Sequence, residues 1–186
     1  HLYALYDGIP QEIERSPELR EAFRKIVDIK LENHYKKAGF MSFGVVQLGQ
    51  AATSLGAGEL AYAAILRLAN SYWLGNLASM HNHRSLFNMD ISGGMPAVII
   101  KALVGSAPGR VRLLPALPRA WPKGAIEGVL CRGRIEINRL GWDGRTIQVS
   151  LTSAKRQTIS LELPAGIAAI EATTGRPSKQ SARLRP

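Results

Sequence analysis

The sequence of 186 residues is long enough for one ordinary domain or two small ones, and its 46% hydrophobic and 20% charged residues are typical of a globular protein. No apolar run approaches the roughly 20 residues that a membrane-spanning helix requires, since even Met95–Val104 is interrupted by Pro96 and Lys101. The single Cys131 excludes an internal disulfide and a cysteine-based metal cluster, and its apolar neighbours predict a buried structural residue.

The charge of the chain is unevenly placed. Residues 1–90 hold nine Lys/Arg and nine Asp/Glu, whereas residues 91–186 hold fifteen and five, so the second half carries the whole net charge of +10. A basic half is compatible with nucleic-acid binding. Here, however, the cations alternate with apolar residues on expected strands, and that pattern favours a solvated, solubilising face. We therefore expect no nucleic acid among the partners of this protein.

Four helices are predicted in the first part of the chain. Ser16, Pro17 and Glu18 form a helix-start signal, with a capping hydroxyl, a proline at the first helical position and an acid near the positive end of the helix dipole. The last of the four is expected to begin after a Ser92-Gly93-Gly94 turn and is apolar on most sides, so we expect it to be buried. Short connections predict an array of α/α hairpins, with helices over about residues 17–33, 42–55, 59–73 and 95–104.

After Gly109 the apolar period changes to the two-residue alternation of strands, which we expect over about 110–114, 128–140 and 146–163. An Asp143-Gly144 pair between two such runs is typical of a hairpin turn and predicts antiparallel pairing. From residue 173 onward the Gly, Pro, Ser and Arg content predicts a disordered basic tail. The expected fold class is α+β, with a helical part over residues 1–109, a β-domain over 110–172 and a tail over 173–186.

The densest polar segment, Asn76–Gly94, lies between two expected helices, where a helical scaffold places substrate contacts. It holds two of the four histidines, His81 and His83, and one carboxylate, Asp90. Because Asp90 stands among apolar residues just before a helix, we expect desolvation and nearby hydrogen-bond donors to act on its ionisation. The alternative is that Asp90 only caps the helix that follows.

Two other kinds of chemistry are weighed for this segment. Paired imidazoles with a carboxylate are plausible metal ligands, but two histidines and one aspartate in a single loop are a weak pattern. A Ser-His-Asp hydrolase is disfavoured, because no Gly-x-Ser-x-Gly elbow occurs and Ser42 stands at an expected helix start. We therefore predict neither a metal nor a cofactor.

Several short strings stand in order over nearly all of residues 1–165: His1-Leu2-Tyr3-x-Leu5-Tyr6, Asn76-Leu77…His81…Phe87-x-x-Asp90, Leu113-Leu114-Pro115-Ala116-Leu117-Pro118…Trp121-Pro122-x-Gly124, Arg132-Gly133 and Trp142-Asp143-Gly144. In their order and spacing these strings resemble glycoside hydrolase family 95, the α-L-fucosidases and related α-L-galactosidases. The resemblance implies an N-terminal β-domain, an (α/α)6 barrel that holds the active site, and a C-terminal β-domain. This chain would contain the closing helices of the barrel and the C-terminal β-domain.

The resemblance also implies an activity and site residues. Enzymes of this family remove terminal α-L-fucosyl or α-L-galactosyl residues with inversion, so that a glutamic acid protonates the leaving oxygen while a water attacks from the opposite face. The matching aspartate, Asp90, would polarise the amides that hold this water. His1 and His81 match pocket-lining histidines and are candidate contacts to sugar hydroxyls, the alternative being hydrogen bonding at helix ends inside the barrel.

In this family the general acid lies in the part of the enzyme that would precede His1, so we expect the natural chain to continue upstream and this piece alone to be inactive. The family string after the aspartate, Gly-Asn-Phe-Gly, is replaced here by Ile91-Ser92-Gly93-Gly94, and the tryptophan expected before the second helix is replaced by Phe40. The resemblance implies a secreted or periplasmic enzyme with no membrane partner. Two alternatives stay open: a basic β-domain that binds polysaccharide or nucleic acid, and a β-domain that only braces the barrel.

Overall fold

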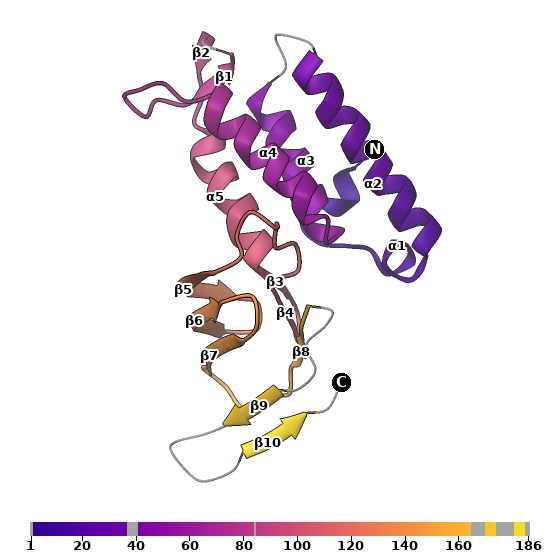
Figure 1. Ribbon diagram of the computed structural model, residues 1–186, viewed down its shortest axis with the longest axis vertical. Coiled ribbons are helices and arrows are strands. Elements are labelled where there is room, and N and C mark those ends of the chain that lie inside the picture. The colour runs from indigo at the N-terminus through magenta and orange to yellow at the C-terminus, as the bar shows by residue number, and fades with distance from the viewer. Residues whose placement is uncertain (1, 37–40, 84, 165–169, 174–180, 185–186) are drawn as a thin grey trace.

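The computed structural model describes residues 2–36, 41–83, 85–164, 170–173 and 181–184, and it places helices in one half of the molecule and most strands in the other (Figure 1). A short 3-10 turn, Tyr3–Leu5, precedes five helices: α1 Gln11–Arg15, α2 Pro17–Lys36, α3 Ser42–Ser54, α4 Gly58–Ser71 and α5 Asp90–Leu103. A small hairpin of β1 Met80–Asn82 and β2 Ser85–Phe87 separates α4 from α5. The remaining strands are β3 Val104–Ala107, β4 Arg110–Leu113, β5 Gly124–Cys131, β6 Ile135–Trp142, β7 Ile147–Ser153, β8 Ser160–Glu162, β9 Ile170–Thr173 and β10 Ser181–Leu184.

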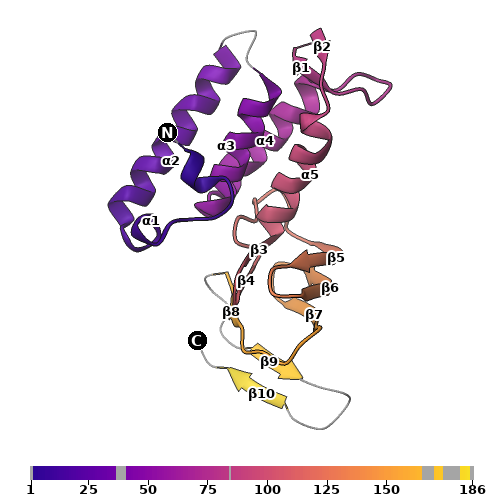
Figure 2. The ribbon, with the colours of Figure 1, turned by 180° about the vertical axis from the view of Figure 1, so that it is seen from behind.

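The helical half is an α-helical array around α3. Helix α2 begins where the sequence predicts, because the Leu19 N–H donates to Ser16 Oγ at 3.1 Å and so satisfies one of the free donors of the first turn. Helix α3 is buried along most of its length and packs against α2, α4 and α5. Seen from behind, α5 runs along the edge of this array and leads directly into the strands (Figure 2).

Helix α5 corrects one sequence-based expectation. The predicted turn at Ser92-Gly93-Gly94 does not exist, because α5 begins at Asp90 and passes through all three residues and through Pro96. The reason lies in packing. A Cβ added to Gly94 would stand 2.7 Å from Val46 Cγ2 on α3, so this glycine allows two helices to approach closely. Glycine here serves helix packing, whereas the sequence pattern is also typical of a turn.

The β half contains two three-stranded sheets, with strand orders β3-β4-β8 and β5-β6-β7, and the two-stranded β9-β10 sheet. The antiparallel expectation is confirmed for β5–β6 and β6–β7, whereas β4 and β8 pair in parallel. The Asp143 carboxylate closes the β6–β7 hairpin by accepting from the backbone N–H groups of Arg145 and Thr146. In the β half, the first strand starts at Val104, before the expected boundary at residue 110, because β3 continues α5 without a break.

The last segment also differs from the expected tail. Strand β10 lies within residues 173–186 and pairs antiparallel with β9, with Ser181 opposite Thr173. Residues 174–180 and 185–186 of the predicted tail lie outside the described residues. Among the described residues, no helix is long and apolar enough to cross a membrane.

Two hydrophobic cores meet at the end of α5. One core is formed by the helices and the other by the strands, and the partly buried Ile99 and Trp121 pack against both. The Leu113–Pro118 string supplies the join, since the Leu114 and Ala116 N–H groups donate to the carbonyls of Leu103 and Ala102 at 2.7 and 3.0 Å. These bonds satisfy carbonyls that the end of a helix leaves free. The Leu113–Pro118 string thus ends helix α5 and fixes the β3-β4-β8 sheet against it.

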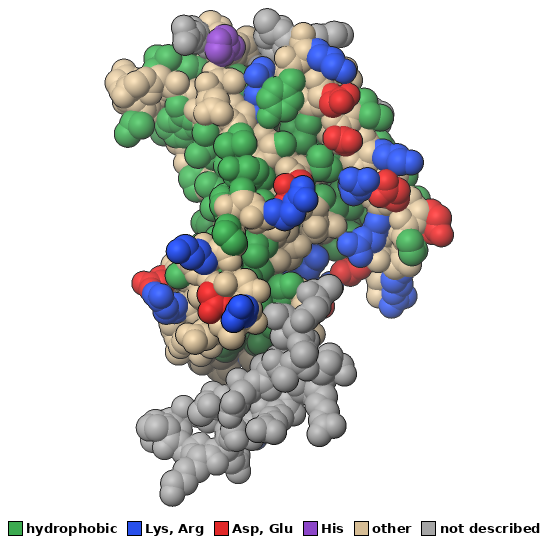
Figure 3. Space-filling model, viewed as in Figure 1, with side chains coloured by type: hydrophobic (Ala, Val, Ile, Leu, Met, Phe, Trp, Pro, Cys, Tyr) green, Lys and Arg blue, Asp and Glu red, His purple; other side chains and the backbone are tan. Residues whose placement is uncertain are grey.

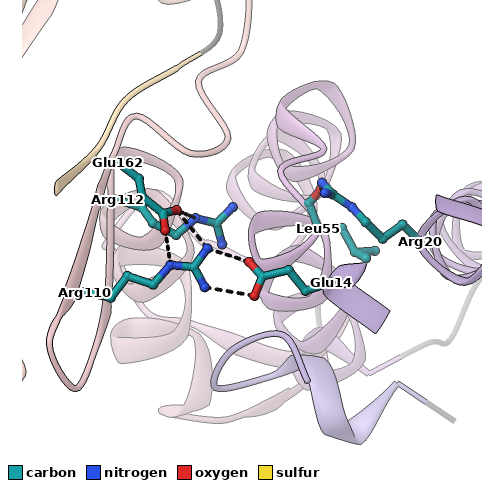
Figure 4. Close-up of polar contacts among 6 residues, drawn as sticks. All are labelled: Glu14, Arg20, Leu55, Arg110, Arg112 and Glu162. Carbon is teal, nitrogen blue, oxygen red and sulfur yellow. Dashed lines mark hydrogen bonds and ion pairs between the residues drawn. The ribbon is translucent and has the colours of Figure 1, made fainter. Parts of the chain in front are cut away.

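One arginine completes the contact between the two halves. Arg110, on β4, donates to both carboxylate oxygens of Glu14 on α1, at 2.9 and 2.5 Å, and also to both oxygens of Glu162 on β8 (Figure 4). The three side chains are between 28% and 37% exposed, so water screens the pairs only in part. Paired hydrogen bonds from Arg110 lower the pKa of Glu14 and raise that of Arg110. We call this group the Arg110 clasp.

The two glycines of α5 provide a matched test of its packing. We expect Gly94→Ala to destabilise the fold by about 1–3 kcal/mol, because the new methyl group collides with the stiff, buried Val46. Gly93→Ala is the control, since Gly93 is exposed with no atom within 4 Å of an added Cβ, and there alanine should stabilise the helix by about 0.5–1 kcal/mol. Denaturant unfolding of both variants measures the difference, and equal effects would contradict the packing described here.

The Arg110 clasp predicts a pH dependence. The pKa of Glu14 is lower in the folded chain than its ordinary value of 4.5, so its stabilising effect is fully present above pH 4.5 and is lost as the pH falls through the folded pKa. We expect Glu14→Gln to lower the free energy of unfolding by roughly 1 kcal/mol at pH 7, and by less as the pH decreases below 4.5. Unfolding curves at several pH values measure this, with exposed Glu12→Gln on the same helix as the control. A pH-independent loss would show that the ionised pair is not the cause.

Candidate functional site

The polar segment between α4 and α5 is a folded hairpin. Met80 pairs with Phe87 and Asn82 with Ser85, and the hairpin is attached to the end of α4 by a Met80 N–H to Tyr72 carbonyl bond of 2.8 Å. An isolated bridge between Trp73 and Ser79 adds a second backbone pairing beside the end of α4. The segment thus presents its side chains from strands and a helix start, which hold them more rigidly than an irregular loop would.

Asp90 is the first residue of α5, at the positive end of the helix dipole. It does not cap the helix, because Met89 occupies the capping position and no side chain caps it there. The Asn88 side chain instead spans this turn: its Oδ1 accepts from the Asp90 N–H, and its Nδ2 donates to Asp90 Oδ2 at 3.0 Å. Among the described residues only Asn88 is hydrogen-bonded to the carboxylate, so Oδ1 of Asp90 is open to another donor.

Asp90 is less buried than its sequence neighbours suggest. Asp90, Phe87 and Met89 are exposed, and only Ile91 is buried. The desolvation expected from the sequence is therefore not found in this chain, because the apolar side chains of β2 and of Met89 point outward. The carboxylate instead stands at an exposed apolar surface.

Two serines support the turn that holds Asp90. Ser79 is 1% exposed, and its hydroxyl contacts both the Asn88 carbonyl and Ser92 Oγ, the latter at 3.0 Å. The Asn88 N–H donates in turn to the Ser79 carbonyl at 3.0 Å. The hairpin is thereby joined to the first turn of α5. Sequence reasoning did not identify Ser79 or Asn88. The signal for Asn88 was the Asn-x-Asp spacing before a helix, which is typical of an Asx turn.

The histidines are held in different ways. His81, half-buried on β1, contacts Asn82 Oδ1 through Nδ1 at 2.7 Å, and His83, exposed, contacts the Ser71 carbonyl through Nδ1 at 3.0 Å. Since a carbonyl oxygen only accepts, Nδ1 of His83 carries a proton, and the same assignment for His81 leaves Nε2 of each ring available for another contact. His1 lies outside the described residues, as does Arg84.

The arrangement was also searched for metal ligands. In the part of the chain that the structure describes, no group of three or more His, Cys, Asp or Glu side chains is placed to hold a metal ion. What the hairpin does bring together is an exposed carboxylate, an amide that orients it and an imidazole on the preceding strand. Such groups can hydrogen-bond sugar hydroxyls or the amides that hold a water.

Comparisons with known proteins agree on one family. Residues 105–184 match the family model described as glycoside hydrolase family 95, C-terminal domain. The chain is also 28% identical over 164 residues to a protein named Alpha-L-fucosidase 2 from Arabidopsis thaliana, with 82% of this chain and 18% of that protein covered. The chain therefore spans less than a fifth of the length of that relative.

Proposed function

We propose that this chain, which belongs to glycoside hydrolase family 95, forms the C-terminal part of an inverting exo-α-L-glycosidase that removes terminal α-L-fucosyl or α-L-galactosyl residues from glycans. The family match over residues 105–184 and the likeness to a protein named Alpha-L-fucosidase 2 support hydrolase activity as part of a longer chain. In this proposal α2–α5 close an (α/α)6 barrel, and the strands from β3 onward form the C-terminal domain. The enzyme acts in a secreted or periplasmic location.

The proposal rests on one observation: the Asp90 carboxylate does not cap helix α5, and its Oδ1 is open to another donor. An inverting glycosidase needs an acid on one face of the sugar and an activated water on the other. Asp90 acts on the water side, where Oδ2 is oriented by Asn88 and Oδ1 polarises a donor amide from another part of the enzyme. His81 offers Nε2 to a sugar hydroxyl from β1, and His1 makes a second contact of this kind.

The surface around Asp90 supports a larger enzyme. Apolar side chains gather over the helical half and over the end that carries β1 and β2 (Figure 3). Exposed apolar patches of this kind mark surfaces that another part of a protein covers. Around β1, β2 and the start of α5 these exposed side chains are Leu77 at 77%, Met89 at 70%, Leu86 at 67% and Phe87 at 62%. In the proposal the preceding part of the enzyme covers them and removes water from the site.

The proposal also accounts for the separation of roles along the chain. Because proton donation and water activation each contribute on the order of 10²–10⁴-fold, a piece that holds only the water side is inactive.

The alternative of a basic module for nucleic acid or polysaccharide is less favoured. Five of its arginines already form ion pairs within the chain: Arg110, Arg112, Arg119, Arg132 and Arg139. Paired cations offer less free charge to phosphates.

Hydrolysis of aryl α-L-fucoside and α-L-galactoside by the full-length enzyme tests the role of Asp90. We expect Asp90→Asn to lower kcat by at least about 10²-fold with little change in KM, because the interaction is made mainly in the transition state. Asp28→Asn, the same change on an exposed face of α2, is the control and should leave kcat unchanged. Parental activity in Asp90→Asn at equal folded concentration would return Asp90 to a structural role.

A further inference from the structure

A cavity lies at the other end of α5 from Asp90, where the helical half meets the strands. Its volume is about 330 Å³, and its walls come from the Asp7–Ile9 segment, the last turn of α5, β3, β4 and the end of β5. With 14 residues α5 is about 21 Å long, so the cavity is well separated from the hairpin that carries Asp90. Such a volume is at the lower end of small-molecule sites and fits a group no larger than one sugar ring.

Cations dominate the lining of this cavity. Lys101, Arg110, Arg112 and Arg132 line it, against the single carboxylate of Asp7. Two of the four cations are hydrogen-bonded to carboxylates. The Arg110 guanidinium is occupied by the Arg110 clasp, and Arg132 pairs with Asp7 at 2.7 Å between Nη2 and Oδ2.

Lys101 and Arg112 are the two cations whose donors are not matched. The Lys101 ammonium donates to the Tyr6 carbonyl, and within the described part of the chain no carboxylate lies at ion-pair distance from it. Arg112, 23% exposed, has one ion pair there, 3.6 Å from Nε to Glu162 Oε2, and that carboxylate already accepts from Arg110 through both oxygens. A guanidinium has five N–H donors and an ammonium three, so most of these donors have no acceptor among the described residues.

Half-buried cations of this kind carry an energetic cost. Burial lowers the pKa of both Lys101 and Arg112, because their charged forms lose hydration without gaining a full partner. An anion that enters the cavity would supply the missing acceptors and offset that cost. The apolar part of the lining, which includes Ile100, Val104 and Val129, excludes water and strengthens such an interaction.

From the cavity and its two unmatched donors we infer that Lys101 and Arg112 form a binding site for an oxyanion: a carboxylate, sulfate or phosphate group, free or carried by a ligand no larger than a sugar ring. The site lies on the seam between the two halves, so its ligand also stabilises their contact. This inference does not depend on the glycosidase activity proposed for the hairpin end.

Calorimetric titration of the full-length protein, at constant ionic strength in chloride, tests the site with sulfate, phosphate and D-glucuronate, and with D-glucose as the neutral control. We expect saturable binding of the anions and none of glucose. Arg112→Met and Lys101→Met should each weaken binding at least about 10-fold, since each removes charge-assisted hydrogen bonds. Arg139→Met, an equal loss of charge on the exposed face of β6, should leave it unchanged. Tighter binding of glucuronate identifies an acidic sugar, and tighter binding of sulfate or phosphate an inorganic ion.

Two results would overturn the inference: anions that bind no better than glucose, or an equal loss of affinity in Arg139→Met and Arg112→Met. A second measurement uses the unaltered protein, in case the cavity variants fail to fold. Cys131 lines the cavity, so the bound anion should slow its alkylation by a small neutral thiol reagent, followed by mass spectrometry of its peptide. An alkylation rate that is unchanged at saturating sulfate and glucuronate also rules the site out.

Discussion

Arg110 connects three segments that are far apart in the sequence. Its backbone belongs to β4, and its guanidinium binds Glu14 on α1 and Glu162 on β8. Helix α1 and two strands of the β3-β4-β8 sheet are therefore joined by one group of hydrogen bonds. Without these carboxylates a half-buried arginine would be costly, and without the arginine two carboxylates would repel each other across the seam. This group therefore contributes to the relative placement of the helical and β halves, together with the backbone bonds of Leu114 and Ala116 to the end of α5.

The remaining structure follows from that placement. Helix α5 runs directly into β3, and the Leu113–Pro118 string closes its last carbonyls, so the clasp and the string together fix its C-terminal end. A helix fixed at one end and packed along α3 has a defined position at its other end, where Asp90 lies. The strands from β3 onward therefore act on the position of the hairpin through α5, and the cavity with Lys101 and Arg112 occupies the seam between the two halves.

Local signals in the sequence predicted much of the fold. The Ser16 cap and the Asp143-Gly144 hairpin are read from a few neighbouring residues, and both are found in the structure. The failures depend on residues far apart in the chain. Gly94 looks like a turn residue until Val46 of α3 is placed against it, and the parallel β4–β8 pair could not be deduced from either strand alone. At the candidate site Asp90 is predicted both from its polar segment and from the resemblance, whereas the roles of Ser79 and Asn88 appear only once the hairpin is folded.

The most direct test of this account is hydrogen exchange of the full-length protein with Arg110 replaced by Met, which keeps the aliphatic stem and removes every donor. If the Arg110 clasp fixes the two halves, protection should fall together in α1, in β8 and at the C-terminal end of α5, with α3 and β6 little changed. Faster exchange confined to β8 would contradict the account, because it would mean that the helical half keeps its position without the arginine.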